Sequence, residues 1–244
     1  MVTLNRWLTA QEYEQSFWTK LANKIETGAI HQLDWYQWKA SELAKRLAKH
    51  LTAGQKEHGR VLEIGSGPIG IINFLEYAHR YSIDPLEPFY KASATLSELR
   101  KPGTNYLGGT GENLPFPESF FSLVIIDNVI DHTYSPTKVL QEMNRVLENN
   151  GLLYLAVNIR TAWGAMMHKV LASLHIDKGH PHTFTNRVIR DLLSANQFKI
   201  SKEEIDDYYD VNKQHLRSEN VRERIKGYTG ISEFAYRAFC HKYP

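Results

Sequence analysis

One short segment has the residue types and spacing of a ligand-binding loop. Gly65, Gly67 and Gly70 follow directly after the apolar run of residues 61–64, and Glu63 stands two positions before the first glycine. Glycines let the backbone approach a ligand closely, and the helix expected next would supply free N–H groups. The G-x-G-x-x-G spacing therefore predicts a loop that binds a nucleotide or a nucleoside.

Two carboxylates narrow the choice of ligand. Glu63 would repel the pyrophosphate of a dinucleotide, but it would attract the ammonium and sulfonium of S-adenosylmethionine (SAM). At about 4 Å and an effective dielectric near 20, each such charge interaction is worth about 4 kcal/mol before desolvation. Asp84, 21 residues after Glu63, can accept hydrogen bonds from ribose hydroxyls of either ligand. The sign of the charge at Glu63 favours SAM.

Alternating strands and helices must position this loop. Short apolar or mixed runs predict strands over residues 61–64, 81–84, 105–107, 123–126 and 152–157, and helices over 68–78, 89–99, 136–147 and 185–193. Two further strands, 198–205 and 234–240, flank a polar excursion and are expected to pair antiparallel at the sheet edge. Apolar strands that alternate with helices indicate a parallel sheet covered on both faces. We expect an α/β, Rossmann-like three-layer sandwich, mostly parallel with an antiparallel edge strand.

We expect residues 1–53 to form an N-terminal helical segment, the cap. Thr9 is expected to be the N-cap residue of a helix there, because Glu12 stands at the capping-box spacing. Residues 54–244 then form the SAM-binding domain, with a cover insertion at 160–184. Aromatic residues crowd the cap, and they are expected either to form core or to close over an acceptor pocket. They are Trp7, Phe17, Trp18, Trp35, Tyr36 and Trp38.

Residues from about 60 to 158 resemble the methyltransferase-11 group of class I SAM-dependent methyltransferases. The resemblance rests on four segments in the expected order: residues 63–70, 111–117 (GENLPFP), 120–132 and 136–151. It implies SAM lying across the carboxyl ends of the first, second and fourth strands. The cofactor residues that it implies are Glu63, Gly65, Ser66, Gly67 and Gly70 at the methionine end, Asp84 at the ribose, Gly111 and Glu112 at adenine, and Asp127 and Asn128 beneath the cofactor.

The chain departs from the group at three positions. Thr110 stands where relatives often have aspartate, so adenine recognition is expected to rely on backbone groups or Glu112. Ser122 replaces another common aspartate, with an expected effect on strand packing. Residues 149–151 (NNG) replace the usual PGG turn, and asparagine tolerates turn conformations.

Histidines supply the candidate catalytic groups. A general base helps an oxygen acceptor, and histidine suits neutral pH. His132 follows the fourth strand, and His180 lies in the loop before the helix at 185; the alternatives are a packing role and loop structure. His180 and His182 alone would be an incomplete metal site, because catalytic zinc normally takes three protein ligands. No metal is expected.

Composition limits the remaining functions. The 244 residues include 23% charged residues, a net charge of +2 and a single cysteine, Cys240, so no internal disulfide can form. Basic residues in the polar excursion alternate with Glu219 and Glu223, which indicates a solvated face and not a nucleic-acid track. With no signal peptide or membrane span recognised, a cytoplasmic location is expected. The oligomeric state is left open.

We therefore expect an enzyme that transfers a methyl group from SAM to oxygen or nitrogen of a small molecule. Three alternatives stay open: a nucleic-acid methyltransferase, a non-catalytic SAM-binding sensor or partner subunit, and an NAD-dependent oxidoreductase.

Overall fold

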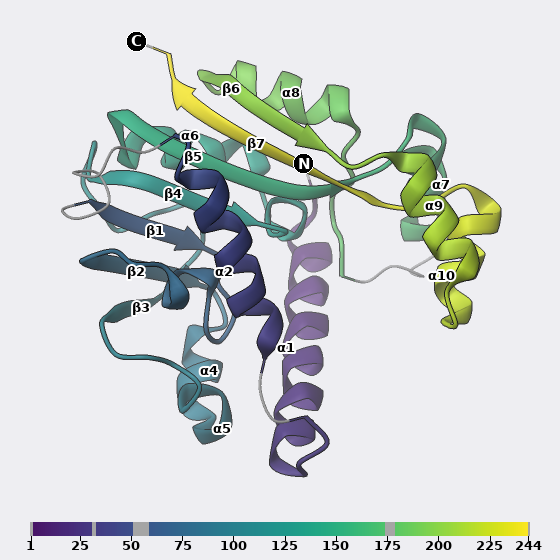
Figure 1. Cartoon of the computed structure of the whole chain (residues 1–244), viewed down its shortest axis with the longest axis horizontal. Helices are drawn as coiled ribbons and strands as arrows, with labels where there is room; N and C mark the ends of the chain where they lie inside the picture. Colours follow the sequence, from purple (N-terminus) through teal and green to yellow (C-terminus); the bar gives the residue numbers. More distant parts are fainter. Residues whose placement is uncertain (1, 31–32, 51–58, 174–178, 244) are drawn as a thin grey trace.

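The computed structural model describes residues 2–30, 33–50, 59–173 and 179–243. Within them, seven strands form one sheet in the order β3-β2-β1-β4-β5-β7-β6. The strands are β1 (Arg60–Ile64), β2 (His79–Asp84), β3 (Thr104–Gly108), β4 (Phe121–Asp127), β5 (Leu147–Ile159), β6 (Phe198–Ile205) and β7 (Phe234–Lys242). Strands β1 to β5 run parallel, and β7 pairs antiparallel with both β5 and β6. The expected fold class is confirmed, including the antiparallel pair at the edge (Figure 1).

Strand register brings the predicted site residues to one edge of the sheet. Ile64, the last residue of β1, lies level with Ile83 of β2 and Ile126 of β4. The next residue of each chain segment, Gly65, Asp84 or Asp127, therefore emerges at the same edge. This is the carboxyl edge, where open α/β sheets bind their ligands.

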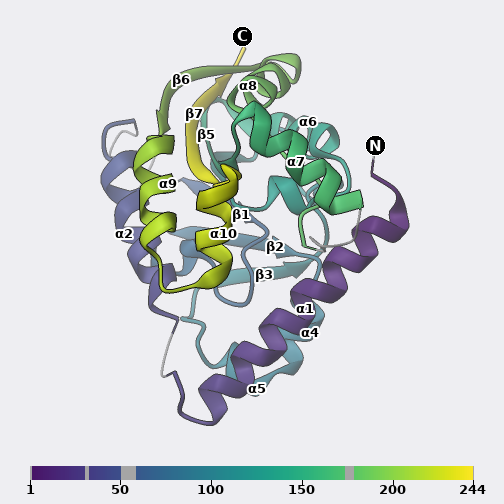
Figure 2. The same cartoon turned by 90° about the vertical axis from the view of Figure 1, so that its right-hand side faces the viewer.

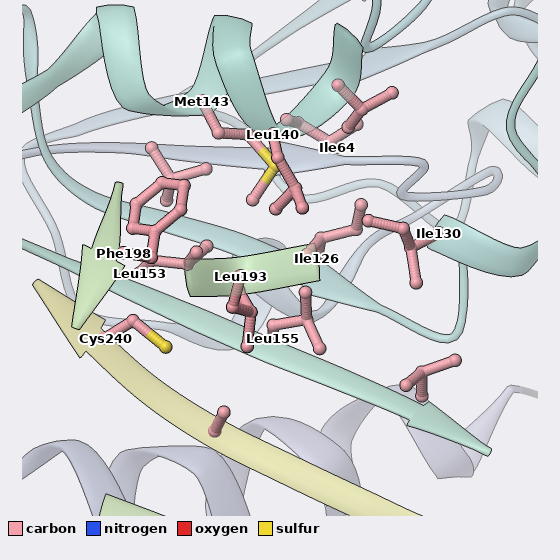
Figure 3. Close-up of a cluster of buried hydrophobic side chains, with 14 of the residues drawn as sticks. Ile64, Ile126, Ile130, Leu140, Met143, Leu153, Leu155, Leu193, Phe198 and Cys240 are labelled. Carbon is pink, nitrogen blue, oxygen red and sulfur yellow. The ribbon is translucent and has the colours of Figure 1, made fainter. Parts of the chain in front are cut away.

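Helices cover both faces of the sheet. They are α1 (Leu4–Glu26), α2 (Asp34–Leu47), α4 (Glu87–Ala92), α5 (Ala94–Ser97), α6 (Pro136–Val146), α7 (Ala162–Ser173), α8 (Asn186–Ala195), α9 (Tyr208–Arg217) and α10 (Val221–Thr229), with short 3-10 turns η1 (Ile71–Phe74) and η2 (Ile130–His132). On one face, α6 and α8 bury Leu140, Met143 and Leu193 against β-strand residues such as Ile126 and Leu155 (Figure 3). The opposite face packs against α2, η1 and α4.

The N-terminal helices α1 and α2 lie in the segment expected to form the cap, and their buried residues belong to the same core as the sheet. Helix α2 buries Leu43 and Leu47 with Val61 and Leu123, which are strand residues. Helix α1 crosses the carboxyl edge of the sheet (Figure 2). It begins at Leu4, capped by Thr3, so the predicted cap at Thr9 is wrong. The predicted boundary at residues 53–54 lies outside the described residues.

The helix expected over residues 68–78 is reduced to η1, a single 3-10 turn. Gly67 and Gly70 take positive φ angles of 63° and 82°, and Leu75 is already extended, so a regular helix is confined to the residues between. Helix α2 packs against η1. We infer that α2 covers the part of the sheet face that a longer helix after β1 would cover.

Three other expected elements differ from the structure. The helix expected over residues 89–99 is divided into α4 and α5, because Ser93 is extended and caps α5. Strand β5 begins at Leu147, before the expected turn at 149–151, because Leu147 pairs with Phe121 of β4. The polar excursion between β6 and β7 holds the helix pair α9 and α10, which is visible in Figure 2.

No helix in the described part of the chain is long and apolar enough to cross a membrane.

Candidate active site

A cavity of about 410 Å³ lies at the carboxyl edge of the sheet. The ends of β1, β2 and β4 and the loops that follow them form its floor, while α1 and α2 supply its outer wall. All the predicted cofactor residues except Gly70 line it, namely Glu63, Gly65, Ser66, Gly67, Asp84, Gly111, Glu112, Asp127 and Asn128. The sequence segments that predicted a single site thus meet in one cavity.

The glycine loop is held tightly between the sheet and the cap. A Cβ atom on Gly67 would lie 2.5 Å from the hydroxyl of Tyr36, and φ at Gly67 is 63°. The same hydroxyl donates a hydrogen bond to the carbonyl of Ser66 at 3.1 Å. Only glycine meets both demands at position 67, because other L-residues avoid this backbone region. The loop conformation therefore depends on α2 as well as on the glycines.

Glu63 is buried, and its carboxylate organises the loop. Its two oxygens accept hydrogen bonds from the backbone N–H groups of Ile71 and Ile72, at 3.1 and 2.8 Å. Gly70 is close by, where a Cβ would lie 2.6 Å from the carboxylate. Burial raises the pKa of Glu63 to about 7, although the two backbone hydrogen bonds act in the opposite direction. Glu63 thus acts on the loop backbone and adds negative potential to the cavity.

Asp84 ends β2 and also faces the loop. Its carboxylate accepts hydrogen bonds from the backbone N–H groups of Gly67 at 2.9 Å and Leu86 at 2.8 Å. Burial raises the pKa of Asp84 to about 6. Each carboxylate oxygen has about two acceptor positions, so Asp84 can still accept from a ligand hydroxyl.

Asp127 and Asn128 follow β4 on the cavity floor. Lys39 of α2 forms an ion pair with Asp127, with Nζ and Oδ1 2.6 Å apart. The side-chain amide of Asn128 donates to the same oxygen at 3.0 Å, and Asn128 has a positive φ of 55°. The sequence does not reveal Lys39 as a partner, because it lies 88 residues away in the cap.

Gly111 and Glu112, the residues expected to border adenine, line the cavity. A Cβ on Gly111 would lie 3.0 Å from Ile64 Cγ2, so the backbone runs close to β1. The carboxylate of Glu112 accepts a hydrogen bond from the backbone N–H of Ser135 at 3.0 Å, which fixes the side chain to the start of α6.

The cavity has an excess of negative charge. Its charged lining residues are five carboxylates (Glu14, Glu63, Asp84, Glu112 and Asp127) and one lysine, Lys39. A pyrophosphate would be repelled in these surroundings, whereas a ligand with an ammonium and a sulfonium would be attracted. The charged residues of the whole cavity, and not Glu63 alone, therefore favour a cationic ligand.

The predicted catalytic histidines come together beside the cavity. The ring centroids of His132 and His180 are 4.7 Å apart, and His132 lines the cavity. His182 instead donates its backbone N–H to the carbonyl of Asp131, at 3.1 Å, and its ring bonds to the carbonyl of Thr133 at 2.9 Å. Burial lowers the pKa of His182. His182 thus supports the loop, whereas the other two histidines face each other.

The aromatic residues of the cap close much of the cavity. Trp7, Phe17, Trp18, Trp35 and Tyr36 line it, whereas Trp38 is 64% exposed and lies elsewhere. The ring of Trp18 stacks on Tyr36, with centroids 6.5 Å apart. Gln11 and Glu14 of α1 also line the cavity, and sequence reasoning missed both because no local motif marks them.

The expected cover insertion at 160–184 includes α7, which among the described residues contributes no side chain to the cavity lining. Residues 174–178 lie outside the described part of the chain. Helix α7 contacts the α9–α10 pair through Trp163, whose Nε1 donates to the carbonyl of Thr229 at 3.0 Å.

This sheet order, with a ligand cavity at its carboxyl edge, defines the class I methyltransferase fold, and comparison with known proteins agrees. Residues 62–155 match the family model of the methyltransferase-11 domain. Residues 62–155 are thus similar to a methyltransferase domain, and SAM is the cofactor that this similarity indicates.

Individual relatives are distant. An uncharacterized methyltransferase of Mycobacteroides abscessus is 26% identical over 158 residues, which are 62% of this chain and 56% of that protein. The chain spans about half the length of the relatives that it matches in sequence.

Solved structures show the same fold. A SAM-dependent methyltransferase of Thermotoga maritima, described as a possible histamine N-methyltransferase, has a TM-score of 0.58 at 16% identity, covering 97% of this chain and 99% of that one. Geranyl diphosphate C-methyltransferase of Streptomyces coelicolor, solved with S-adenosylhomocysteine, has a TM-score of 0.57 at 12% identity, covering 83% and 79%. The fold class predicted from the sequence is confirmed, and the match of residues 62–155 to the methyltransferase-11 model agrees with the predicted family and with SAM as its cofactor.

Proposed function

We propose that the protein transfers the methyl group of SAM to a small molecule bound beneath α1. The observation that carries this proposal is the cavity itself: it lies at the carboxyl edge of a methyltransferase sheet, and five carboxylates with one lysine line it. Such surroundings favour a cationic nucleoside over NAD, because the phosphates of NAD are anionic.

Within this proposal, the residues have separate tasks. The loop at Gly65, Ser66 and Gly67 holds the methionine end of SAM, Asp84 receives the ribose hydroxyls, and the backbone near Gly111 borders adenine. Methyl transfer is an in-line displacement at the sulfonium, so positioning of donor and acceptor supplies much of the rate. Bound SAM would supply the electrophilic methyl group.

The acceptor side is assigned to His132, His180 and the aromatic residues of α1. His132 and Trp7 both line the cavity, and the ring of Trp7 lies edge-on to Tyr134 at a centroid distance of 6.4 Å. Aromatic walls with a few polar groups are typical of small-molecule pockets. This arrangement supports a small acceptor with an apolar or aromatic part over a nucleic acid, which would need an open basic track.

A test of the function is to incubate the full chain with SAM carrying a labelled methyl group and with fractionated small-molecule extracts, in parallel with RNA and DNA. S-adenosylhomocysteine formation that depends on a small-molecule fraction is the expected result. Methylation of nucleic acid alone would contradict the choice of acceptor. SAM binding with no transfer to any fraction would instead favour a sensor.

A matched pair of variants separates binding from transfer. Asp84→Asn should weaken SAM binding, because the neutral amide would be a weaker acceptor for the ribose hydroxyls and removes negative charge. His132→Asn should leave SAM binding within about twofold and lower the transfer rate by about a hundredfold or more, the usual size of a general-base contribution. Unchanged transfer by the His132 variant would remove that residue from the acceptor side.

A further inference from the structure

Three potential metal ligands meet at the acceptor end of the cavity. Asp131 and His132 belong to η2, and His180 lies in the segment before α8. One ligand atom from each of them lies within 4.8 Å of the other two. His132 Nε2 and Asp131 Oδ2 are 3.9 Å apart. The sequence separates His180 from the other two by nearly fifty residues, and only the fold brings them together.

The carboxylate of Asp131 provides an independent indication of a cation. Asp131 is only 7% exposed, and within the described part of the chain its Oδ1 has no hydrogen-bond partner. A buried carboxylate is costly unless a charge or a donor compensates it. Its other oxygen, Oδ2, faces the imidazole of His132, and imidazole nitrogens commonly bind metal ions. A bound cation would offset the cost of burying Asp131.

The backbone around the cluster is fixed by hydrogen bonds. The carbonyl of Asp131 accepts from the backbone N–H of His182 at 3.1 Å, and the N–H of His132 donates to the carbonyl of Val129 at 2.8 Å. Arg6 of α1 donates to the carbonyl of His180 at 3.0 Å. The three side chains therefore start from supported positions on separate segments, as a pre-organised ligand set requires.

We propose that Asp131, His132 and His180 bind a divalent transition metal ion of the zinc class. Two imidazoles and one carboxylate are a common protein ligand set for zinc and its neighbours, with ligand distances of about 2.0–2.2 Å. The side chains would have to close by roughly 1 Å to reach that geometry. Three protein ligands leave a fourth position for water or a substrate atom. This differs from the expectation of no metal, which rested on His180 and His182.

If the proposed function holds, the fourth coordination position of the metal would bind the methyl acceptor. His132 lines the cavity, so a metal bound to it lies at the acceptor end. The acceptor class would then be molecules with an oxygen or nitrogen atom that can bind zinc, such as a carboxylate, an enolate or a phenolate. The metal would orient this atom and favour its deprotonated form, so His132 would assist deprotonation as a metal ligand and not as the base that accepts the proton.

The test uses the full chain, freed of metal by a chelator and without SAM or acceptor. Zn²⁺ binding is measured by calorimetry, and Co²⁺ is added as a spectroscopic probe whose visible absorption reports nitrogen and oxygen ligands. Wild type should bind one equivalent of Zn²⁺. Asp131→Asn and His180→Ala should each weaken that binding about tenfold or more, as loss of a ligand does.

His241→Gln is the matched control, because His241 bonds to the carbonyl of Gly151 at 3.0 Å, far from the cluster in the fold. This variant should bind Zn²⁺ like wild type. Circular dichroism and SAM titration of each variant verify the fold.

Failure of wild type to bind Zn²⁺ or Co²⁺ would overturn the proposal. Equal binding by folded His180→Ala and wild type would overturn it too, because the ion would then occupy other histidines. Neither result decides whether the cavity binds SAM, because SAM binding is measured separately with SAM alone.

Discussion

The hydroxyl of Tyr36 donates a hydrogen bond to the carbonyl of Ser66, across 3.1 Å, and thereby links the N-terminal helix α2 to the glycine loop after β1. Tyr36 is buried, and its ring stacks on Trp18, which also lines the cavity. Burial raises the pKa of Tyr36 well above its ordinary value, so this hydroxyl stays protonated and acts as a donor. Cap and loop therefore form one structural unit.

Tyr36→Phe tests that unit. Loss of the hydrogen bond should lower the free energy of unfolding by about 1 kcal/mol and weaken SAM binding severalfold, because the Ser66 carbonyl loses its donor. Thermal unfolding and calorimetry measure the two effects. Tyr209→Phe is the control, since Tyr209 is 79% exposed and the same change there should alter neither quantity. If both variants bound SAM like wild type, the cap would not support the loop.

Gly67→Ala should weaken SAM binding more than Tyr36→Phe does. The added Cβ would lie 2.5 Å from the Tyr36 hydroxyl, and the positive φ of 63° would cost about 1–2 kcal/mol besides. We expect SAM binding to fall at least tenfold. Gly28→Ala provides the comparison, because Gly28 has a φ of 71° but nothing within 4 Å of its added Cβ. That variant should lose a similar backbone energy and keep SAM affinity; equal loss of affinity in both would contradict the steric argument.

Lys39→Met should lower the free energy of unfolding more than the loss of a surface ion pair does, because the Asp127 side chain is largely buried. It leaves the Asp127 carboxylate, whose side chain is 10% exposed, without its cation, and we expect about 1–3 kcal/mol of destabilisation. Lys45→Met breaks the ion pair with Glu42 at the surface, where Lys45 is 69% exposed, and should leave the free energy of unfolding almost unchanged because solvent screens this pair. Chemical denaturation of both variants measures the difference. Similar values would show that the Asp127 pair is as weak as a surface pair.

Because Glu63 and Asp84 are buried carboxylates, we expect SAM binding to depend on pH. Burial raises the pKa of Glu63 to about 7 and that of Asp84 to about 6, above the values near 4 expected in the unfolded chain. Between pH 4 and 7 the folded protein therefore binds more protons than the unfolded one, and these two groups make it less stable as pH rises. The positive charges of SAM favour the ionised forms, so SAM affinity should increase from pH 5 to pH 8.

Calorimetry across that range measures both the affinity and the release of protons on binding. In Glu63→Gln the increase should be smaller, because one of the two titrating groups is gone. A SAM affinity that stays constant from pH 5 to pH 8 in wild type would contradict the assignment of these carboxylates to the cofactor site.

The sequence predicts the sheet and the glycine turn after β1 well because these features are local. The strands 61–64 and 123–126 are apolar runs, and Glu63 with its glycines forms a motif within eight residues. The helix expected at 68–78 is wrong for one local and one tertiary reason. Gly67 and Gly70 take positive φ angles, and α2 packs against the short turn η1 that forms instead. Only the folded chain shows which distant helix covers a given strand.

Within the site, too, the sequence does not reveal contacts between residues that lie far apart in the chain. Lys39 and Glu14 reach the cavity from the cap, and no motif near them reveals a partner at Asp127 or the glycine loop. His180 was a candidate because of its loop, but its proximity to His132 and Asp131 depends on the end of β4 meeting the segment before α8. Side-chain clusters built from separate segments cannot be read from spacing in one segment.

The most direct test of a SAM site in the cavity is a titration of the 244-residue chain with SAM and with NAD at pH 8. We expect one SAM site per chain, with NAD binding at least a hundredfold more weakly, because the cavity carboxylates repel its phosphates. Asp84→Asn should weaken SAM binding about tenfold, the loss expected of a charge-assisted hydrogen bond. NAD binding as tight as SAM binding, or SAM binding that is indifferent to Asp84, would contradict the account.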